Sequence, residues 1–354
     1  MPKRDERRER RKGAFNRFIA ITSLLLVSVA CLGSPPPNIV LILTDDLGYG
    51  DLGAYGATHV TTPNLDALAA SGVLFTNFYS ASSVCSPSRA ALLTGSYPLR
   101  VGVPNVLFPN GAWGTNPNSG LHPEEETIAD LLQKSGYATA MAGKWHLGHR
   151  PALLPTRQGF DDYFGIPFSN DMTIVPSMKL ATDIKFNSGW TVDTISDIQG
   201  QDLRAYPPLM KNEEVIEVPV VQKTMTRRLT DYAVSFISAN AGKRPFFLYL
   251  AHSMPHVPLN TSVDFEGVSR KGIYSDVISE IDWSVAQVIS ALSLHEVRKN
   301  TLVFFLSDNG PWRSYGNHSG KTGGLRGGKF DVWEGGFRVP AIASWPAQIP
   351  RGGT

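Results

Sequence analysis

The sequence predicts an α/β fold in which a large, mostly parallel central sheet is flanked by helices. Continuous apolar runs of strand length, such as NIVLILT at residues 38–44 and TLVFFL at residues 301–306, are typical of parallel strands buried on both faces. Segments with helical apolar periodicity lie between such runs, and strands that alternate with helices indicate one layered sheet. The 354 residues suffice for one large domain or two ordinary ones.

The elements can be placed in order along the chain. The strands are expected at residues 38–44, 73–78, 137–142, 245–251 and 301–306. The helices are expected at residues 63–71, 87–94, 124–135, 229–237 and 274–289. Thr62 and Pro63 fit the N-cap and first position of the first helix, and Gly72 fits its end. Residues 166–222 lack clear periodicity, and we expect an insertion there.

Residues 1–37 are expected to be a targeting segment and linker before a catalytic domain at residues 38–354. Residues 1–17 are basic, and residues 18–32 form an apolar run too short for a comfortable membrane span. Three alternatives remain open: a cleaved signal peptide, an uncleaved anchor, and a lipid anchor on Cys31, which ends a loose match to a bacterial lipobox. Each implies export, as a periplasmic protein, an outer-membrane lipoprotein or an extracellular protein.

Charge and cysteine content exclude two classes of protein. The formal net charge is +2, but the basic residues gather at the N-terminus and the remaining chain is mildly acidic. Because a nucleic-acid interface needs a basic face, we expect no nucleic-acid partner. The 2 cysteines, Cys31 and Cys85, allow no disulfide framework.

Two of the expected strands end in side chains that carry oxygen ligands. Asp45 and Asp46 follow the first strand, and Asp308 and Asn309 follow the last. Ligands of such sheets bind at the carboxyl ends of the strands. Carboxylates and an amide suit Ca²⁺ or Mg²⁺ rather than zinc, although either acidic pair alone is often only a helix cap or a turn.

The segment CSPSR at residues 85–89 places a cysteine at the start of a helix. Ser86 is a suitable N-cap and Pro87 fits the first helical position, so Cys85 lies where backbone N–H groups favour an anion. Arg89, one turn further along, can face the same anion. The alternative is that Cys85 is a buried packing residue, as lone cysteines often are.

Basic side chains follow two further strands and occupy a glycine-rich loop. Lys144 and His146 alternate in GKWHLG and can point the same way in an extended chain. His252 and His256 follow the strand PFFLYLA, and Lys329 lies in GLRGGKFDVWEGG. Each of them alone can be structural or solvated. Together with the acidic pairs and Cys85, they indicate a site for a tetrahedral oxyanion, with acid–base groups for its leaving oxygen.

These segments resemble the sulfatase family. CSPSR followed by AALLTG is similar to the family signature, in which the cysteine of C-x-P-x-R is oxidised to formylglycine. NIVLILTDDLGYGDLGAYG, TPNLD, GKWHLG, SDNG and GGKFDVWEGGFRVPA resemble further sulfatase segments in the family's order, between about residues 38 and 350. GIPFSND at residues 165–171 is similar to a segment of the arylsulfatase A and N-acetylgalactosamine-6-sulfatase branch. The resemblance implies an alkaline-phosphatase-like sandwich of helices around a large mixed sheet.

The resemblance also implies a role for each candidate residue. The implied ligands of one Ca²⁺ are Asp45, Asp46, Cys85 in its modified form, Asp308 and Asn309. The implied catalytic residues are Cys85, Arg89, Lys144, His146, His256 and Lys329, and the expected substrate contacts are Ser169 and His252. In the family, the positions of Arg89 and Lys144 hold the aldehyde hydrate, and that of His146 takes a proton when the intermediate collapses. The positions of His256 and Lys329 bind sulfate oxygens and assist the leaving group.

The resemblance implies an exported, calcium-dependent sulfatase that hydrolyses an aryl sulfate or a sulfated sugar after maturation by a formylglycine-generating enzyme. An aldehyde hydrate has two hydroxyls, of which one attacks sulfur and the other expels sulfate, so no stable ester must be hydrolysed. One alternative is a phosphonate or phosphate ester hydrolase of the same superfamily. Another is a truncated, non-catalytic protein that binds sulfated glycans.

The resemblance ends at Thr354, where relatives continue into a small C-terminal subdomain that is missing from this sequence. We therefore expect an exposed apolar strip at residues 338–345, where that subdomain would pack.

Overall fold

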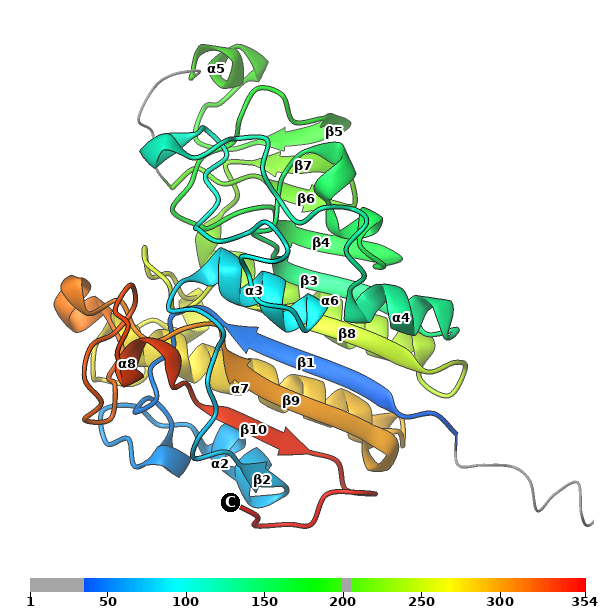
Figure 1. Cartoon of the computed structure of the whole chain (residues 1–354), viewed down its shortest axis with the longest axis vertical. Helices are drawn as coiled ribbons and strands as arrows, with labels where there is room; N and C mark the ends of the chain where they lie inside the picture. Colours follow the sequence, from blue (N-terminus) through cyan, green and yellow to red (C-terminus); the bar gives the residue numbers. More distant parts are fainter. Residues whose placement is uncertain (1–34, 199–204) are drawn as a thin grey trace, which may run out of the picture. The chain divides into compact units, whose positions relative to one another are not determined.

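The computed structural model describes residues 35–198 and 205–354, of which those from Pro37 onward form one compact unit. A 10-stranded sheet runs through this unit in the order β2-β10-β9-β1-β8-β3-β4-β6-β7-β5 (Figure 1). Its strands are β1 Asn38–Thr44, β2 Val73–Leu74, β3 Ala138–Lys144, β4 Asp162–Ile166, β5 Leu180–Phe186, β6 Leu209–Lys211, β7 Glu214–Val218, β8 Phe246–Ala251, β9 Thr301–Ser307 and β10 Ala341–Ser344. The expected targeting segment, including Cys31, lies outside the described residues apart from its last three positions.

The centre of the sheet is parallel, and its register sets the position of the site. β1 pairs in parallel with both β8 and β9, and β3 pairs in parallel with β8 and β4. Leu43 lies opposite Ala251 and Leu306, and Gly143 also lies opposite Ala251. The carboxyl ends of β1, β3, β8 and β9 are therefore level, so the residues that follow them leave the sheet along one edge.

Helices cover both faces of the sheet (Figure 1). They are α2 Pro63–Ala70, α3 Cys85–Thr94, α4 Ile128–Lys134, α5 Val192–Asp197, α6 Met225–Asn240, α7 Ile273–Leu294 and α8 Glu334–Phe337. Alternate residues of β1 enter two apolar clusters: Val40 and Ile42 pack with α2, α6 and α7, whereas Leu41 and Leu43 pack with α3 and α4. By length and composition α7 is a candidate membrane span, but its window is 56% buried inside the unit, as expected of a core helix. The expected α/β sandwich is confirmed.

Two helix starts differ from those expected. The helix predicted at residues 124–135 begins only at Ile128, because the Thr127 hydroxyl and the Asp130 carboxylate form a capping box there. α3 begins at Cys85 itself, with Val84 as its N-cap. The Ser86 hydroxyl is not the cap, since it accepts a hydrogen bond from the Leu107 backbone N–H at 3.1 Å.

Among the described residues of 166–222, where an insertion was expected, the strands β5, β6 and β7 extend the main sheet beyond β4. One larger expectation is wrong. The strip at 338–345 is not an exposed apolar surface: Val339, Ala341 and Ile342 are fully buried. The reason is that Ile342 and Ala341 enter the apolar clusters on the two faces of the sheet, while β9 and β2 pair with both edges of β10.

The Thr127 cap provides a test of the fold. Its hydroxyl accepts from the Asp130 N–H at 3.1 Å and donates to the Gln158 carbonyl at 3.0 Å, in a fully buried position. Thr127→Ala should lower the free energy of unfolding by about 1–2 kcal/mol, measured by urea denaturation, because it leaves backbone groups without partners. Thr191→Ala, at the exposed start of the six-residue α5, is the matched control and should cost less. Equal effects of the two variants would contradict this assignment.

Candidate active site

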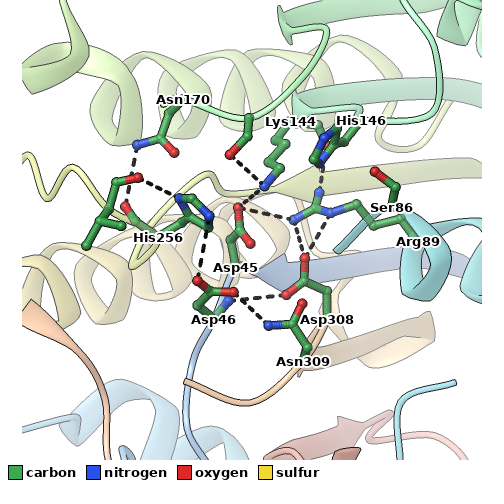
Figure 2. Close-up of polar contacts among 12 residues, drawn as sticks. Asp45, Asp46, Ser86, Arg89, Lys144, His146, Asn170, His256, Asp308 and Asn309 are labelled. Atoms are coloured by element: carbon green, nitrogen blue, oxygen red, sulfur yellow. Dashed lines mark hydrogen bonds and ion pairs between the residues drawn. The ribbon is translucent and has the colours of Figure 1, made fainter. Parts of the chain in front are cut away.

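The edge formed by the ends of four parallel strands brings most of the expected site residues together (Figure 2). Asp45 and Asp46 follow β1, Lys144 ends β3, and Asp308 directly follows β9. Further residues reach the same place from other segments: Cys85, Arg89, His146, Ser169, His256, Asn309 and Lys329. The cause of this convergence is the level register of the strands, because residues far apart in the sequence leave the sheet at one height.

Each carboxylate of the site is paired with a buried cation. Lys144 Nζ contacts Asp45 Oδ2, while Lys329 Nζ lies 2.8 Å from Asp46 Oδ1. The guanidinium of Arg89 donates to Asp308 Oδ2 through Nε at 3.0 Å and approaches the same oxygen through a terminal nitrogen at 2.8 Å. Arg89 also donates to the Lys144 carbonyl at 2.7 Å, which ties α3 to β3. The formal charges of this array therefore balance.

Burial and neighbouring charges move the acid–base properties of these groups in different directions. Burial opposes ionisation of Asp45, but Lys144, His256 and Arg89 hold the pKa of its carboxyl well below the ordinary value. Burial and the charge of Asp45 raise the pKa of Asp308 to about 7. Although the formal charges balance, the carboxylates of Asp45 and Asp308 lie close enough to repel each other, and a bound divalent cation would relieve this repulsion.

The oxygen atoms of the site fit a hard divalent cation. Asp45 Oδ1 and Asn309 Oδ1 are buried and have no hydrogen-bond partner in the described parts of the chain. The Asp46 backbone N–H donates to Asp308 Oδ1 at 3.2 Å, so the ends of β1 and β9 meet on the same side. Ligand atoms of Asp45, Asp46 and His256 lie within 4.8 Å of one another. This group includes His256, which was not expected as a ligand, and does not include Asp308, whose carboxylate is engaged by Arg89.

The two histidines nearest the cysteine have defined hydrogen-bond partners. His146 Nε2 lies 2.9 Å from the Leu107 carbonyl and must donate to it, so Nδ1 is the free acceptor. Burial and the charge of Lys144 lower the pKa of His146 well below its usual range, which keeps the ring neutral. His256 Nδ1 donates to the Val257 carbonyl at 2.6 Å, and burial lowers its pKa as well.

Cys85 lines a cleft of about 880 Å³. His146, Ser169, His256 and Lys329 line the cleft with it, so the acid–base groups and the cysteine face one space. Cys85 is only 2% exposed, and burial raises the pKa of its thiol. An unmodified thiol there stays protonated near neutral pH and is a weak nucleophile.

Of the two expected substrate contacts, the structure brings one to the cleft. Ser169 lines it, and its hydroxyl accepts from Lys144 Nζ at 3.1 Å. His252 is fully buried beneath the site, and its Nε2 lies 3.2 Å from the Ser284 hydroxyl of α7. The interpretation of His252 as a substrate contact is therefore not carried further, because its side chain points into the layer between sheet and helix.

Sequence reasoning missed two groups that position the site. Asn170 donates to the backbone carbonyls of His256 and Pro258 at 3.4 Å and 3.2 Å, and so holds the His256 loop. The Leu107 peptide bonds to Ser86 with its N–H and to His146 with its carbonyl. A backbone group carries no residue-specific signal, so Leu107 could not be found from the sequence. Asn170 directly follows Ser169 in GIPFSND, and this neighbouring position was the sequence signal that could have identified it.

Comparison with known proteins agrees with this arrangement. A family model described as Sulfatase matches residues 37–353. Arylsulfatase A of Homo sapiens is 43% identical over 338 residues, covering 94% of this chain and 64% of that protein. N-acetylgalactosamine-6-sulfatase of Canis lupus familiaris is 39% identical over 350 residues, covering 93% of this chain and 62% of that protein. The chain thus spans less than two thirds of the length of these relatives.

A solved structure is also similar to this chain in three dimensions. The crystal structure of Ps i-CgsB in complex with k-i-k-neocarrahexaose is 33% identical, with a TM-score of 0.74. The similarity covers 90% of this chain and 68% of that one.

The unpartnered oxygens lead to a prediction about metal binding. Saturating Ca²⁺ should raise the melting temperature of the protein, since a ligand at 100 times its Kd stabilises the folded state by about 2.7 kcal/mol. Asp45→Asn removes the charge of the carboxylate that carries one of the two unpartnered oxygens, and should abolish most of this shift. The control is Asp264→Asn, at an exposed surface ion pair, which should keep the shift. A calcium-induced shift of equal size in both variants would show that the ion binds elsewhere.

Proposed function

This chain belongs to the sulfatase family, and from that premise we propose that it hydrolyses sulfate monoesters of sugars or aryl alcohols as a calcium-dependent enzyme with formylglycine at position 85. The observation that carries the proposal is the shared cleft. Cys85, the neutral base His146 and the cation Lys329 line one space, beside buried oxygens that fit a divalent cation. As formylglycine hydrate, residue 85 supplies one hydroxyl to attack sulfur and a second to release sulfate.

The charge of the array favours a sulfate monoester. The carboxylates of Asp45, Asp46 and Asp308 are matched by one cation each, so a bound Ca²⁺ leaves two positive charges to be balanced. An ionised hydroxyl at position 85 and a sulfate monoester bring one negative charge each. A phosphate monoester brings nearly two negative charges, which would leave the occupied site with an excess of negative charge. The charge balance therefore favours a sulfate monoester over a phosphate monoester.

Side chains of the cleft supply the proton transfers and charge stabilisation. His146 Nδ1 is free to accept a proton from residue 85, because Nε2 is committed to the Leu107 carbonyl. Burial opposes ionisation of Lys329, but Asp46 raises the pKa of its ammonium, so it stays charged. Lys329 therefore stabilises negative charge on sulfate oxygens and donates a hydrogen bond to the leaving oxygen. The ion pair of Arg89 with Asp308 fixes the start of α3, which carries residue 85.

Two further parts of the proposal concern maturation and location. Cys85 is buried in the first turn of α3, so a formylglycine-generating enzyme would act on this segment before the chain folds. The basic and apolar segments before residue 33 support export of the domain, with Cys31 as the position of a lipid anchor if one is present. The intact set of acid–base groups in the cleft weighs against the alternative of a non-catalytic glycan-binding protein.

A substrate panel with position 85 variants tests the proposal. Protein matured with a formylglycine-generating enzyme should hydrolyse 4-nitrophenyl sulfate with kcat/KM at least about a hundredfold above that for 4-nitrophenyl phosphate. Cys85→Ser should fold but lose turnover, because a serine sulfate has no second hydroxyl to expel the product. Cys85→Ala is the matched control, which lacks any nucleophile and should be equally inactive.

Three outcomes would contradict the proposal. One is faster hydrolysis of the phosphate ester, which would favour the phosphatase alternative. Another is sustained turnover by Cys85→Ser. The third is binding of sulfated sugars by matured protein without any turnover, which would favour the non-catalytic alternative.

A further inference from the structure

Four of the nine described non-glycine residues at positive φ lie in the reaction centre or in the wall of the cleft beside it. Non-glycine residues at positive φ are uncommon, and a bulky side chain there is costly to hold. Two such residues in this protein belong to the reaction centre, namely Asp46 at φ 65° and His146 at φ 59°. Two others, Trp113 at φ 60° and Phe330 at φ 71°, line the cleft but have no part in the chemistry proposed above.

Both of these aromatic side chains are held in an exposed position. Trp113 is 82% exposed, and its ring stacks on Phe108 with a centroid distance of 6.4 Å and an interplanar angle of 17°. Phe330 is 55% exposed and packs against the edge of Trp312 at 5.3 Å. The exposed apolar rings and the strained backbone each cost free energy in the unliganded protein. A bound molecule that packs on the rings would offset the cost.

The remaining wall of the cleft is polar and carries little charge. Asn105, Asn116 and Ser119 contribute amides and a hydroxyl, and Asp171 contributes a carboxylate whose buried Oδ1 has no partner in the described chain. Lys329, at the bottom, is the single lysine or arginine among the described residues that line the cleft. The described lining of the cleft thus offers one lysine for one anionic group, and beyond it only neutral groups and the carboxylate of Asp171.

Resting on the proposed function, we propose that this cleft takes the end of a sugar chain that bears one sulfate, with uncharged units next to it, and that Trp113 and Phe330 are its specificity-determining residues. The flat rings present apolar surface to the C–H face of a pyranose. The amides and Asp171 accept and donate hydrogen bonds to its hydroxyls. The volume of about 880 Å³ lies near the upper end for ligand sites and leaves room beyond a single sulfated unit.

Other substrates fit this lining less well. A small aryl sulfate would pack on the rings but would leave the amides and Asp171 without partners, which costs binding energy at polar sites. A second sulfate or a uronic acid carboxylate on the neighbouring unit would meet no further lysine or arginine among the described lining residues and would be repelled by Asp171. The charge of the cleft therefore selects against densely anionic chains.

The test compares three kinds of substrate with one matured enzyme. They are 4-nitrophenyl sulfate, a set of disaccharides with one sulfate at single positions of the terminal hexose and a neutral neighbour, and the same set with a hexuronic acid as neighbour. The best neutral disaccharide should exceed both its hexuronic counterpart and the aryl sulfate in kcat/KM by about tenfold or more.

Variants separate the contributions of the aromatic rings and of Asp171. Trp113→Ala and Phe330→Ala should raise KM for the neutral disaccharide more than they raise KM for the aryl sulfate. Asp171→Asn should reduce the preference for the neutral over the hexuronic neighbour. Tyr97→Ala is the control, since Tyr97 is 81% exposed and does not line this cleft. It should change neither value, and thermal melts should show all four variants folded.

The inference is overturned if the hexuronic disaccharide is as good a substrate as the neutral one, or if Trp113→Ala and Phe330→Ala affect both substrate types equally. A preference that is unchanged in Asp171→Asn overturns the role of that carboxylate. Absence of any sulfate release, from aryl sulfate and disaccharides alike, would instead contradict the proposed function itself, so the two failures are distinguishable.

Discussion

Three buried ion pairs at one edge of the sheet are the constraint on which the rest of this structure depends. They join Asp45 to Lys144, Asp46 to Lys329 and Asp308 to Arg89. Burying charges costs several kcal/mol per ion even when they are paired, so apolar residues of similar volume would often stabilise the fold as well or better. The pairs are therefore best explained by what they prepare, namely a place where a cation and two anionic groups meet with little rearrangement.

The sequence was informative wherever one residue type has one dominant physical use. Apolar runs without alternation identified the central strands, and their polar ends identified Asp45, Asp46, Asp308 and Asn309, because parallel strands in level register bring those ends together. Gly95 ends α3 in the left-handed conformation that glycine favours, directly after the last residue expected for that helix. Lys144 and Arg89 could be placed near the cysteine, but their pairing with particular carboxylates depends on distances across the sheet.

Other features depend on tertiary contacts that leave no local pattern. The strands β6 and β7 are short, and they join the sheet because β4 offers β6 a free edge. His252 and His256 lie on the same short loop, yet one side chain points beneath the sheet edge and the other into the cleft. The tautomer of His146, in which Nε2 donates a hydrogen bond to the Leu107 carbonyl and Nδ1 is free, is set by a loop 39 residues away in the sequence. The exposed aromatic walls of the cleft belong to the same class, because only the folded chain shows which rings remain uncovered.

The central claim is that the carboxylate edge and the cleft act as one electrostatic unit, in which a bound cation prepares the site for anions. Calorimetric titration of inorganic sulfate into Cys85→Ala, with Ca²⁺ and after its removal by a chelator, measures this coupling without any turnover. The account predicts that Ca²⁺ tightens sulfate binding by about tenfold or more, within the range usual for coupled sites. Equal sulfate affinity in the two conditions would show that the cation and the anion sites are independent, and would contradict the account.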